Sequence, residues 1–464
     1  MTDAAQPEFP AFRTIREASR RDRLPDLATR RNRLASLRRL VVENRGEIAR
    51  AIDADFGGRP RRETELLEIV PLLTALRNTS RQLKRWMRDE RRHVAWPFQP
   101  GAAWVRHEPL GVIGIISPWN YPLFLALGPL VDALAAGNRA MIKPSELTPT
   151  FSGLLKQLIP EHFDADVVAV ETGGVEIAQA FSALPFDHLV FTGSTDVGRK
   201  VMQAAAPNLT PVTLELGGKS PAVLAPDYPL DKAARSIILG KFTNAGQTCI
   251  APDYVLVPKG RADALARAII ERVEASYPAD GAKDTYCNVI NARHRTRLLE
   301  AVKEARDAGA TILSPSGDYG EKIPPTLVIG APEDFLLLSE EIFGPVLPIV
   351  TYAALDDALA FINRRSRPLA LYVFTDDRHA RKTILNGAIS GGVTLNGTLL
   401  HVAQDNLPFG GIGASGIGAY HGRDGFRRMS HARAIYKPGF FNAFELVGPP
   451  FGKLADLVIR ILGR

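Results

Sequence analysis

Short β-branched runs alternate with helix-length segments over the middle of the chain, and this alternation constrains the fold more than any other feature. The run at residues 112–116 is followed by a helix-length apolar segment at 123–136 and by a second run at 139–143. Further runs lie at residues 167–171, 188–192, 212–214, 253–257 and 326–328. Strands separated by helices predict parallel sheets with crossover helices, so we expect an α/β protein.

The length of the chain predicts more than one compact unit. With 464 residues it exceeds what one simple core encloses, so we expect two or three units. Two cysteines cannot form a disulfide framework, and residues 1–7 lack the features of a secretory signal. These observations favour the cytoplasm, and the absence of a run of about 20 apolar residues argues against a membrane-spanning helix.

The formal net charge of +7 comes largely from arginines in the first hundred residues. Examples are Arg30, Arg31, Arg33, Arg61 and Arg62. Between some of them lie apolar residues at the spacing of an amphipathic helix, namely Leu27, Leu34, Leu37, Leu40 and Val41. We predict helices over residues 10–90, with a break at 57–60, and interpret the arginines as a solvated helix face. No nucleic-acid-binding motif accompanies the charge, so we expect no nucleic-acid partner.

Cys249 is the first candidate for chemistry. It lies between a small polar turn and an apolar, strand-like stretch, where a thiol can face a cleft and act as a nucleophile. A buried structural cysteine is the commoner fate of a free thiol, so the residue alone does not decide its role. Cys287 belongs to no catalytic pattern and is expected to be structural.

Two glycine-rich segments compete as a phosphate-binding site. Gly411, Gly413 and Gly416 match the G-x-G-x-x-G spacing, but no strand precedes them and no good helix follows, which predicts a tight loop. The segment 193–198 breaks that spacing but follows a strand, and we expect a helix to begin at Arg199. Free N–H groups at such a helix start can bind a pyrophosphate, with Ser194 as a further donor. An ordinary turn between strand and helix remains the alternative.

Seven segments that occur in order along nearly the whole chain resemble the aldehyde dehydrogenase superfamily. They are Pro118-Trp119-Asn120, Lys143-Pro144-Ser145-Glu146, Phe191-Thr192-Gly193-Ser194-Thr195, Leu214-Glu215-Leu216-Gly217-Gly218-Lys219, Gln247-Thr248-Cys249, Glu341-Ile342-Phe343-Gly344-Pro345 and Pro408-Phe409-Gly410-Gly411. The sequence of residues 244–254 is similar to that of the class 3 branch, which includes fatty aldehyde dehydrogenases. Residues 401–408 are most similar to the coniferyl aldehyde type.

The resemblance implies a nucleophilic mechanism that turns an aldehyde into a carboxylic acid. Cys249 would attack the carbonyl carbon, and the resulting alkoxide would receive hydrogen bonds from the Asn120 side chain and the Cys249 backbone N–H. After hydride loss a thioester remains, and Glu215 would activate the water that cleaves it. Burial at a strand end is expected to raise the pKa of Glu215. The substrate would be an aromatic, coniferyl-like aldehyde or a medium- to long-chain aliphatic one.

The resemblance also implies NAD as the cofactor, with NADP possible. Lys143 and Glu146 would bind the adenosine ribose, where the Glu146 carboxylate repels a 2′-phosphate and favours NAD. Glu341 and Phe343 would contact the ribose on the nicotinamide side. The other cofactor-binding residues implied are Ser117, Trp119, Thr192, Gly193, Ser194, Val197, Gly198 and Leu216. We expect no metal.

The family fold implies a Rossmann-like cofactor domain at 1–217, interrupted by an arm segment near 89–110, and a catalytic α/β domain at 218–396. A bridging segment at 397–437 would complete a small β oligomerisation arm, and a homodimer is expected. The tail at 438–464 contains a short amphipathic helix that would pack on a subunit, cover the substrate mouth or lie on a membrane.

Three other functions remain open from the sequence. A related type of enzyme would transfer the acyl group of the thioester to coenzyme A. The presence of Glu215 favours water over coenzyme A as the acceptor. A cysteine hydrolase would pair Cys249 with His188 or His421. A binding protein on an inactive scaffold would be expected to lack Cys249, Glu215 or Asn120, and all three are present.

Overall fold

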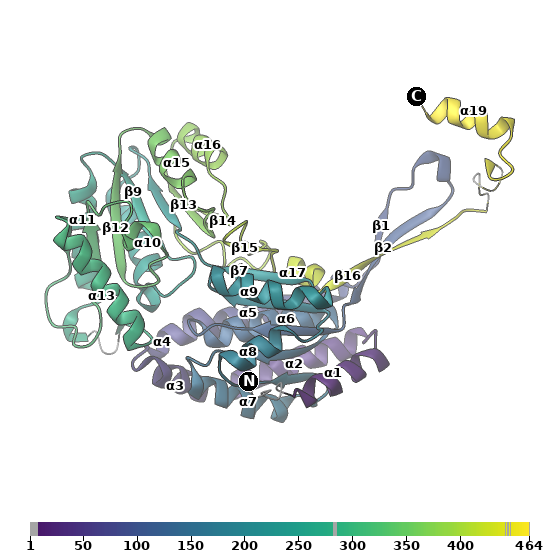
Figure 1. Ribbon diagram of the computed structural model, residues 1–464, viewed down its shortest axis with the longest axis horizontal. Coiled ribbons are helices and arrows are strands. Elements are labelled where there is room, and N and C mark those ends of the chain that lie inside the picture. The colour runs from purple at the N-terminus through teal and green to yellow at the C-terminus, as the bar shows by residue number, and fades with distance from the viewer. Residues whose placement is uncertain (1–7, 282–284, 441, 443–444, 446, 464) are drawn as a thin grey trace, which may run out of the picture.

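The computed structural model describes residues 8–281, 285–440, 442, 445 and 447–463. Two α/β lobes lie side by side, and a β arm projects from one of them with the C-terminal helix at its far end (Figure 1). The strands form a six-stranded, a seven-stranded and a three-stranded sheet. The predicted α/β class is therefore confirmed.

The six-stranded sheet contains five parallel strands that the sequence predicted. Its order is β15-β7-β6-β3-β4-β5, and β15 is antiparallel to β7. The strands are β3 (Val112–Ile116), β4 (Arg139–Lys143), β5 (Val168–Val170), β6 (His188–Gly193), β7 (Val212–Leu216) and β15 (Gly416–Ile417). β3 and β4 are buried along their whole length, which explains why they read as continuous apolar runs.

Helices cover this sheet, and α6 is the most deeply buried of them. The crossover helices are α6 (Pro122–Ala136), α7 (Pro149–His162), α8 (Val175–Ser182) and α9 (Thr195–Ala205), followed by the short η3 (Ala206–Asn208). The N-terminal helices are α1 (Pro10–Arg21), α2 (Leu27–Glu43), α3 (Arg45–Phe56), α4 (Arg61–Thr64), η1 (Glu65–Ile69) and α5 (Val70–Trp86). The predicted helix break is confirmed, because α3 ends at Phe56 and its capping residue, Gly57, has a φ of 61°.

The predicted solvated arginine face is wrong for Arg30. Its side chain is buried and donates hydrogen bonds to the carbonyl oxygens of Pro25 (2.9 Å) and Ala135 (3.1 Å). Ala135 lies in the last turn of α6, where helix carbonyl groups lack partners within the helix. Burial lowers the pKa of Arg30 to about 10. The spacing of residues along one helix cannot show that the end of another helix packs against it. Arg31, the next residue, is exposed as predicted.

The seven-stranded sheet forms the second lobe in the order β10-β11-β12-β9-β8-β13-β14. Its strands are β8 (Pro221–Leu224), β9 (Tyr254–Pro258), β10 (Thr311–Leu313), β11 (Thr326–Ile329), β12 (Val346–Tyr352), β13 (Ala370–Phe374) and β14 (Gly392–Leu395). Its helices are α10 (Leu230–Phe242), η4 (Thr243–Gly246), α11 (Ala262–Ser276), η5 (Ala279–Gly281), α13 (Ala292–Asp307), α14 (Leu336–Ser339), α15 (Leu355–Asn363) and α16 (Arg378–Gly387). All neighbouring strands are parallel except β10, which is antiparallel to β11.

The arm is an antiparallel sheet that joins distant parts of the chain (Figure 1). Its elements are β1 (Glu90–Arg92), η2 (Trp96–Phe98), β2 (Ala102–Pro109) and β16 (Ser430–Lys437), with α17 (Gly422–Arg428) before β16. Beyond the arm, α19 (Lys453–Leu462) exposes most of its apolar residues, among them Leu454, Leu457 and Ile459. Within the part of the chain that the structure describes, no helix is long and apolar enough to cross a membrane.

Candidate active site

An unusual backbone turn places Cys249 between the two lobes. Asn244, Ala245 and Gly246, in η4, have positive φ angles of 53°, 51° and 74°. Non-glycine residues rarely adopt this conformation, and it persists only where the surroundings enforce it. A Cβ at Gly246 would lie 2.3 Å from the carbonyl oxygen of Gly344, so only glycine fits there. The turn therefore needs glycine at position 246 for a steric reason.

Asn120 ties the first lobe to this turn. The residue is buried, and its side-chain amide donates a hydrogen bond to the carbonyl oxygen of Gln247 (3.1 Å). Its own backbone carbonyl accepts hydrogen bonds from Asn244 Nδ2 (3.0 Å) and Arg59 Nη1 (3.2 Å). An amide nitrogen carries two hydrogens, so one remains for a ligand. Asn120 and Cys249 line the same cavity of about 270 Å³.

Glu215 lies at the end of β7 and accepts three side-chain hydrogen bonds. The Cys249 thiol donates to Oε1 (3.5 Å), while the hydroxyl groups of Tyr420 (3.0 Å) and Thr192 (3.3 Å) donate to Oε2. Burial raises the pKa of Glu215, as the sequence predicted, and the three hydrogen bonds oppose that rise. A surface position beside Lys219 is excluded, because the Glu215 side chain is buried.

The thiol of Cys249 needs a base before it can act. Burial, followed by the negative charges of Glu215 and Glu341, raises its pKa well above the usual value. A protonated thiol is a weak nucleophile, and an adjacent carboxylate can activate it by accepting the proton. Glu215 is the acceptor of the thiol hydrogen bond, so it is placed to act on both the thiol and water.

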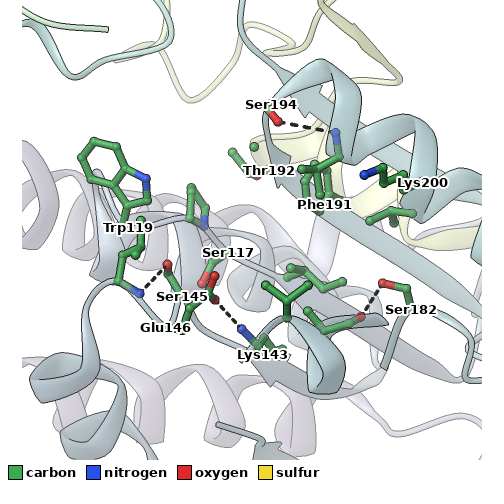
Figure 2. A pocket seen from close by; sticks show the side chains of 18 of the residues that line it. Ser117, Trp119, Lys143, Ser145, Glu146, Ser182, Phe191, Thr192, Ser194 and Lys200 are labelled. Atoms are coloured by element: carbon green, nitrogen blue, oxygen red, sulfur yellow. Dashed lines mark hydrogen bonds and ion pairs between the residues drawn. The ribbon is translucent and has the colours of Figure 1, made fainter. Parts of the chain in front are cut away.

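A larger cavity of about 680 Å³ lies where β3, β4 and β6 end (Figure 2). Within it, Lys143 Nζ lies 2.8 Å from Glu146 Oε2, and only Glu146 is substantially exposed, at 43% against 1%. Burial is the largest influence and would raise the pKa of Glu146, but the hydrogen bond from Lys143, a backbone hydrogen bond and the charge of Lys143 together lower it. An ionised carboxylate thus faces the cavity beside a buried ammonium group.

The turn that follows β6 is shorter than predicted. The helix begins at Thr195 and not at Arg199, because Ser194 caps it and its Oγ accepts a hydrogen bond from the Val197 N–H (3.4 Å; Figure 2). The strand, turn and helix start nevertheless lie at the edge of the larger cavity, as the sequence predicted. The Gly411–Gly416 spacing forms a loop with a single bridge between Gly413 and Gly416, which confirms the tight-loop interpretation.

All but one of the predicted site residues line the two cavities. The larger cavity contains Ser117, Trp119, Lys143, Glu146, Thr192, Gly193, Ser194 and Val197. The smaller one contains Asn120, Glu215, Leu216, Cys249, Glu341 and Phe343, and it shares Trp119, Thr192, Gly193 and Ser194 with the larger. Gly198 lines neither cavity. It lies at the contact of α9 with β7, where a Cβ would be only 2.7 Å from the Leu216 side chain.

Sequence reasoning missed residues that α13 and the C-terminal region contribute. His294 and Arg297, on α13, line both cavities. Arg297 Nη2 donates to the carbonyl oxygens of Glu341 (3.0 Å) and Ile342 (2.7 Å). Tyr420, which donates to Glu215, was missed as well. No motif contains these residues, so only their position in the fold reveals them.

Three buried polar atoms without partners bear on whether a dinucleotide fits the larger cavity and the smaller cavity of Cys249. Ser117 Oγ, Arg297 Nη1 and Glu341 Oε1 have no hydrogen-bond partner among the described residues. Buried polar groups are normally paired, so these atoms indicate a polar ligand. Together with the Lys143–Glu146 pair and the free backbone at the start of α9, they fit a nucleotide with ribose and phosphate groups. In the parts of the chain that are described, no cluster of metal-binding side chains occurs.

A family model described as the aldehyde dehydrogenase family matches residues 9–435. The chain belongs to this family. It is 48% identical over 443 residues to a probable coniferyl aldehyde dehydrogenase of Pseudomonas aeruginosa, covering 95% of this chain and 93% of that protein. It is 38% identical to a dimeric, NADP-preferring aldehyde dehydrogenase of Rattus norvegicus, with 92% and 94% covered. The substrate-bound structure of Staphylococcus aureus AldH superimposes with a TM-score of 0.92 at 36% identity, covering 97% and 98%. These results confirm the predicted family, its class 3-like branch and its fold.

Proposed function

We propose that this aldehyde dehydrogenase oxidises its substrate through a covalent bond to Cys249. The observation that carries the proposal is the 3.5 Å hydrogen bond from the Cys249 thiol to Glu215, in a cavity that also contains Asn120. This cavity shares seven lining residues with the larger one that fits a dinucleotide. A nucleophile, a base, an amide donor and a hydride-acceptor site therefore lie together.

The reaction follows from the positions of these groups. Glu215 takes the thiol proton and releases it to solvent, and the thiolate adds to the carbonyl carbon to give a thiohemiacetal alkoxide. The free N–H of Asn120 and the backbone N–H of Cys249 stabilise that oxygen. NAD(P), when bound, accepts the hydride. The thioester that remains is cleaved by water, which loses its proton to Glu215, and the products are the carboxylic acid and the free thiol.

The Lys143–Glu146 pair supports NAD as the preferred cofactor, with NADP as a possible second one. The Glu146 carboxylate can accept hydrogen bonds from two ribose hydroxyl groups, whereas it repels a 2′-phosphate. Nearly half of the Glu146 side chain is exposed, so a ligand in the cavity can reach its carboxylate. The relative that prefers NADP supports use of both cofactors within this branch. Ser117, Trp119 and the start of α9 would hold the rest of the nucleotide.

For the substrate we propose an aromatic aldehyde of the coniferyl type. The resemblance to the coniferyl aldehyde dehydrogenases, at 44–48% identity, supports this class over aliphatic aldehydes. The assay compares kcat/KM for benzylic, cinnamyl and aliphatic aldehydes. A preference for long aliphatic aldehydes over cinnamyl ones by tenfold or more would contradict the proposal.

The other functions that the sequence left open are less well supported. His188 interacts with Thr213 (2.8 Å) and His421 lines a different cavity, while the described partner of the Cys249 thiol is Glu215. Neither histidine proposed as the base of a cysteine hydrolase therefore contacts the thiol. The buried Glu215 supports water over coenzyme A as the acceptor. Intact Cys249, Glu215 and Asn120 argue against an inactive scaffold.

We also propose a homodimer that works in the cytoplasm. The projecting arm and the dimeric relative support association through β1, β2 and β16. Both cysteines are free, and catalysis requires a reduced thiol, which supports a reducing compartment. The division into a cofactor domain at 1–217, a catalytic domain at 218–396, a bridging segment at 397–437 and a tail remains a prediction, as does the role of α19.

The test is aldehyde-dependent reduction of NAD by the whole chain. Replacement of Cys249 by alanine is expected to abolish it, while NAD binding persists. Cys287→Ala is the matched control, because Cys287 is buried in the core and lines neither cavity. Full aldehyde oxidation by the Cys249→Ala protein would refute the proposed mechanism.

A further inference from the structure

The loop at residues 57–60, between α3 and α4, packs against the segment that carries the nucleophile. Asn288 Nδ2 donates a hydrogen bond to the carbonyl oxygen of Gly57 (2.8 Å), and the Asn288 backbone N–H donates to that of Gly58 (3.0 Å). The carbonyl oxygen of Asn288 accepts a hydrogen bond from Gln247 Nε2 (2.9 Å). A loop that the sequence predicts only as a helix break is therefore fixed beneath the active-site turn.

Arg59 is the only buried residue of this loop. Its backbone N–H donates to Asp53 Oδ1 (2.8 Å), and its side chain forms an ion pair with Glu68, which is also fully buried. Taking two charges out of water is costly, and an apolar pair of similar volume is often as stable or more stable. Stability is therefore a weak explanation for the presence of this pair, and the other contacts of the guanidinium group indicate its role.

The guanidinium group reaches the backbone of Asn120. Arg59 Nη1 donates to the Asn120 carbonyl oxygen (3.2 Å), which also accepts a hydrogen bond from Asn244 Nδ2 (3.0 Å). A carbonyl oxygen has two lone pairs, so both of its acceptor positions are occupied by donors from other parts of the chain. The peptide plane that follows Asn120 is thereby fixed, and with it the direction in which the side-chain amide leaves the backbone.

A second contact leads to the other donor of the proposed reaction, the backbone N–H of Cys249. The Arg59 guanidinium group lies over the ring of Tyr121, 5.1 Å from its centroid, where a cation is attracted to the ring. The hydroxyl groups of Tyr121 and Thr248 form a hydrogen bond (2.7 Å). Thr248 shares a peptide plane with the N–H of Cys249. Arg59 therefore contacts neighbours of both groups that would bind the alkoxide.

Arg59 does not touch the substrate or cofactor sites itself. It lines neither the larger cavity nor the cavity of Cys249, and its side chain is not exposed to solvent. The charge of Glu68 balances its own, so the pair has no net charge that could attract an alkoxide. What Arg59 can contribute is therefore the position of the residues that it contacts.

We propose that Arg59 is a positioning residue of the oxidation, which holds the Asn120 backbone so that the side-chain amide meets the alkoxide formed at Cys249. The inference rests on the proposed function, because it assumes that Asn120 is a donor to that oxygen. Displacement of such a group by about 1 Å can cost on the order of 100-fold in rate. Loss of the contact between Arg59 and Asn120 lowers kcat, whereas NAD binding, in a cavity that Arg59 does not reach, persists.

The test combines Arg59→Met with Glu68→Leu, which removes the ion pair without leaving a buried charge. Well below the Tm of this double variant, kcat is expected to fall at least about tenfold, while KM for the aldehyde and Kd for NAD stay within about threefold. Arg61→Met is the matched control, because Arg61 is 68% exposed and its loss is expected to leave kcat unchanged. Full kcat in the double variant would overturn the inference.

A second measurement separates positioning from a merely structural effect. In the Asn120→Ala background no amide remains to be positioned, so adding the two changes is expected to lower kcat by less than about threefold. A general structural defect lowers kcat by the same factor in both backgrounds, and that result would also overturn the inference. If the double variant does not bind NAD, Arg59→Lys is judged by the same criteria. It keeps the buried charges balanced, but its shorter side chain lacks the planar group that contacts Tyr121 and Asn120.

The Asn120→Ala protein keeps this inference apart from the proposed function. If Asn120→Ala retained full kcat, the donor role of Asn120 in the proposed function would be wrong. If Asn120→Ala lost kcat as expected while the double variant retained it, only the role of Arg59 would be wrong.

Discussion

Replacing Arg59 by methionine should destabilise the protein strongly, because it breaks a fully buried ion pair. Arg59 Nη1 lies 2.8 Å from Glu68 Oε1, and neither side chain is exposed to solvent. Glu68 Oε2 in turn accepts hydrogen bonds from the backbone N–H groups of Leu123 (2.8 Å) and Phe124 (3.1 Å), in the first turn of α6. The pair therefore holds the helix start that follows Asn120.

The magnitude follows from the burial of the two charges. Removing one partner of a buried pair costs about 3–5 kcal/mol, because the other charge is left in a poor environment. Burial already raises the pKa of Glu68 and Arg59 opposes that rise, so loss of Arg59 favours the neutral acid. The neighbouring pair of Arg61 and Glu65 has a similar length, 3.0 Å, but Arg61 is 68% exposed. An exposed pair contributes at most about 1 kcal/mol.

The assay is thermal unfolding followed by circular dichroism, with Arg61→Met as the matched control. One kcal/mol shifts Tm by about 2–4 °C for a unit of 150–250 residues. Arg59→Met should therefore lower Tm by at least about 6 °C, and Arg61→Met by at most about 4 °C. Arg59→Met with Glu68→Leu should recover part of the loss, because no unpaired charge remains. Equal shifts for Arg59→Met and Arg61→Met would refute the reasoning.

Three further predictions concern the active site. Tyr420→Phe removes a hydrogen bond that lowers the pKa of Glu215, so the acid limb of the kcat–pH profile should move to higher pH; an unchanged limb would exclude this role. Asn120→Ala should reduce kcat about 100- to 1,000-fold while the Kd for NAD stays within about threefold, and a small loss of kcat would contradict its role as a donor. Glu146→Gln should raise the ratio of kcat/KM for NADP to that for NAD at least about tenfold, and a constant ratio would show that its charge does not select the cofactor.

The five parallel strands of the first lobe and the segments of the candidate site could be predicted from the sequence because they depend on local patterns, whereas β8, β10, β12, β13 and β14 of the second lobe were not predicted. A buried parallel strand needs a continuous β-branched run, so 112–116 and 139–143 were located with correct bounds. Cys249, Glu215 and Asn120 lie in segments whose order along the chain is distinctive. The start of α9 was placed four residues too late, because the capping contact of Ser194 was not taken into account.

Contacts between distant parts of the chain were decided only by the tertiary structure. Tyr420 lies 205 residues from Glu215 in sequence, yet the two side chains form a hydrogen bond. Arg30 reads as a surface residue of an amphipathic helix, yet it is buried against the end of α6. Burial, pKa and pairing depend on what packs against a residue after the chain has folded, and a local pattern contains no information about that neighbour. The sequence determined the parallel strands of the first lobe, the family and the candidate nucleophile, whereas the fold decided which groups lie against that candidate and which cavity contains them.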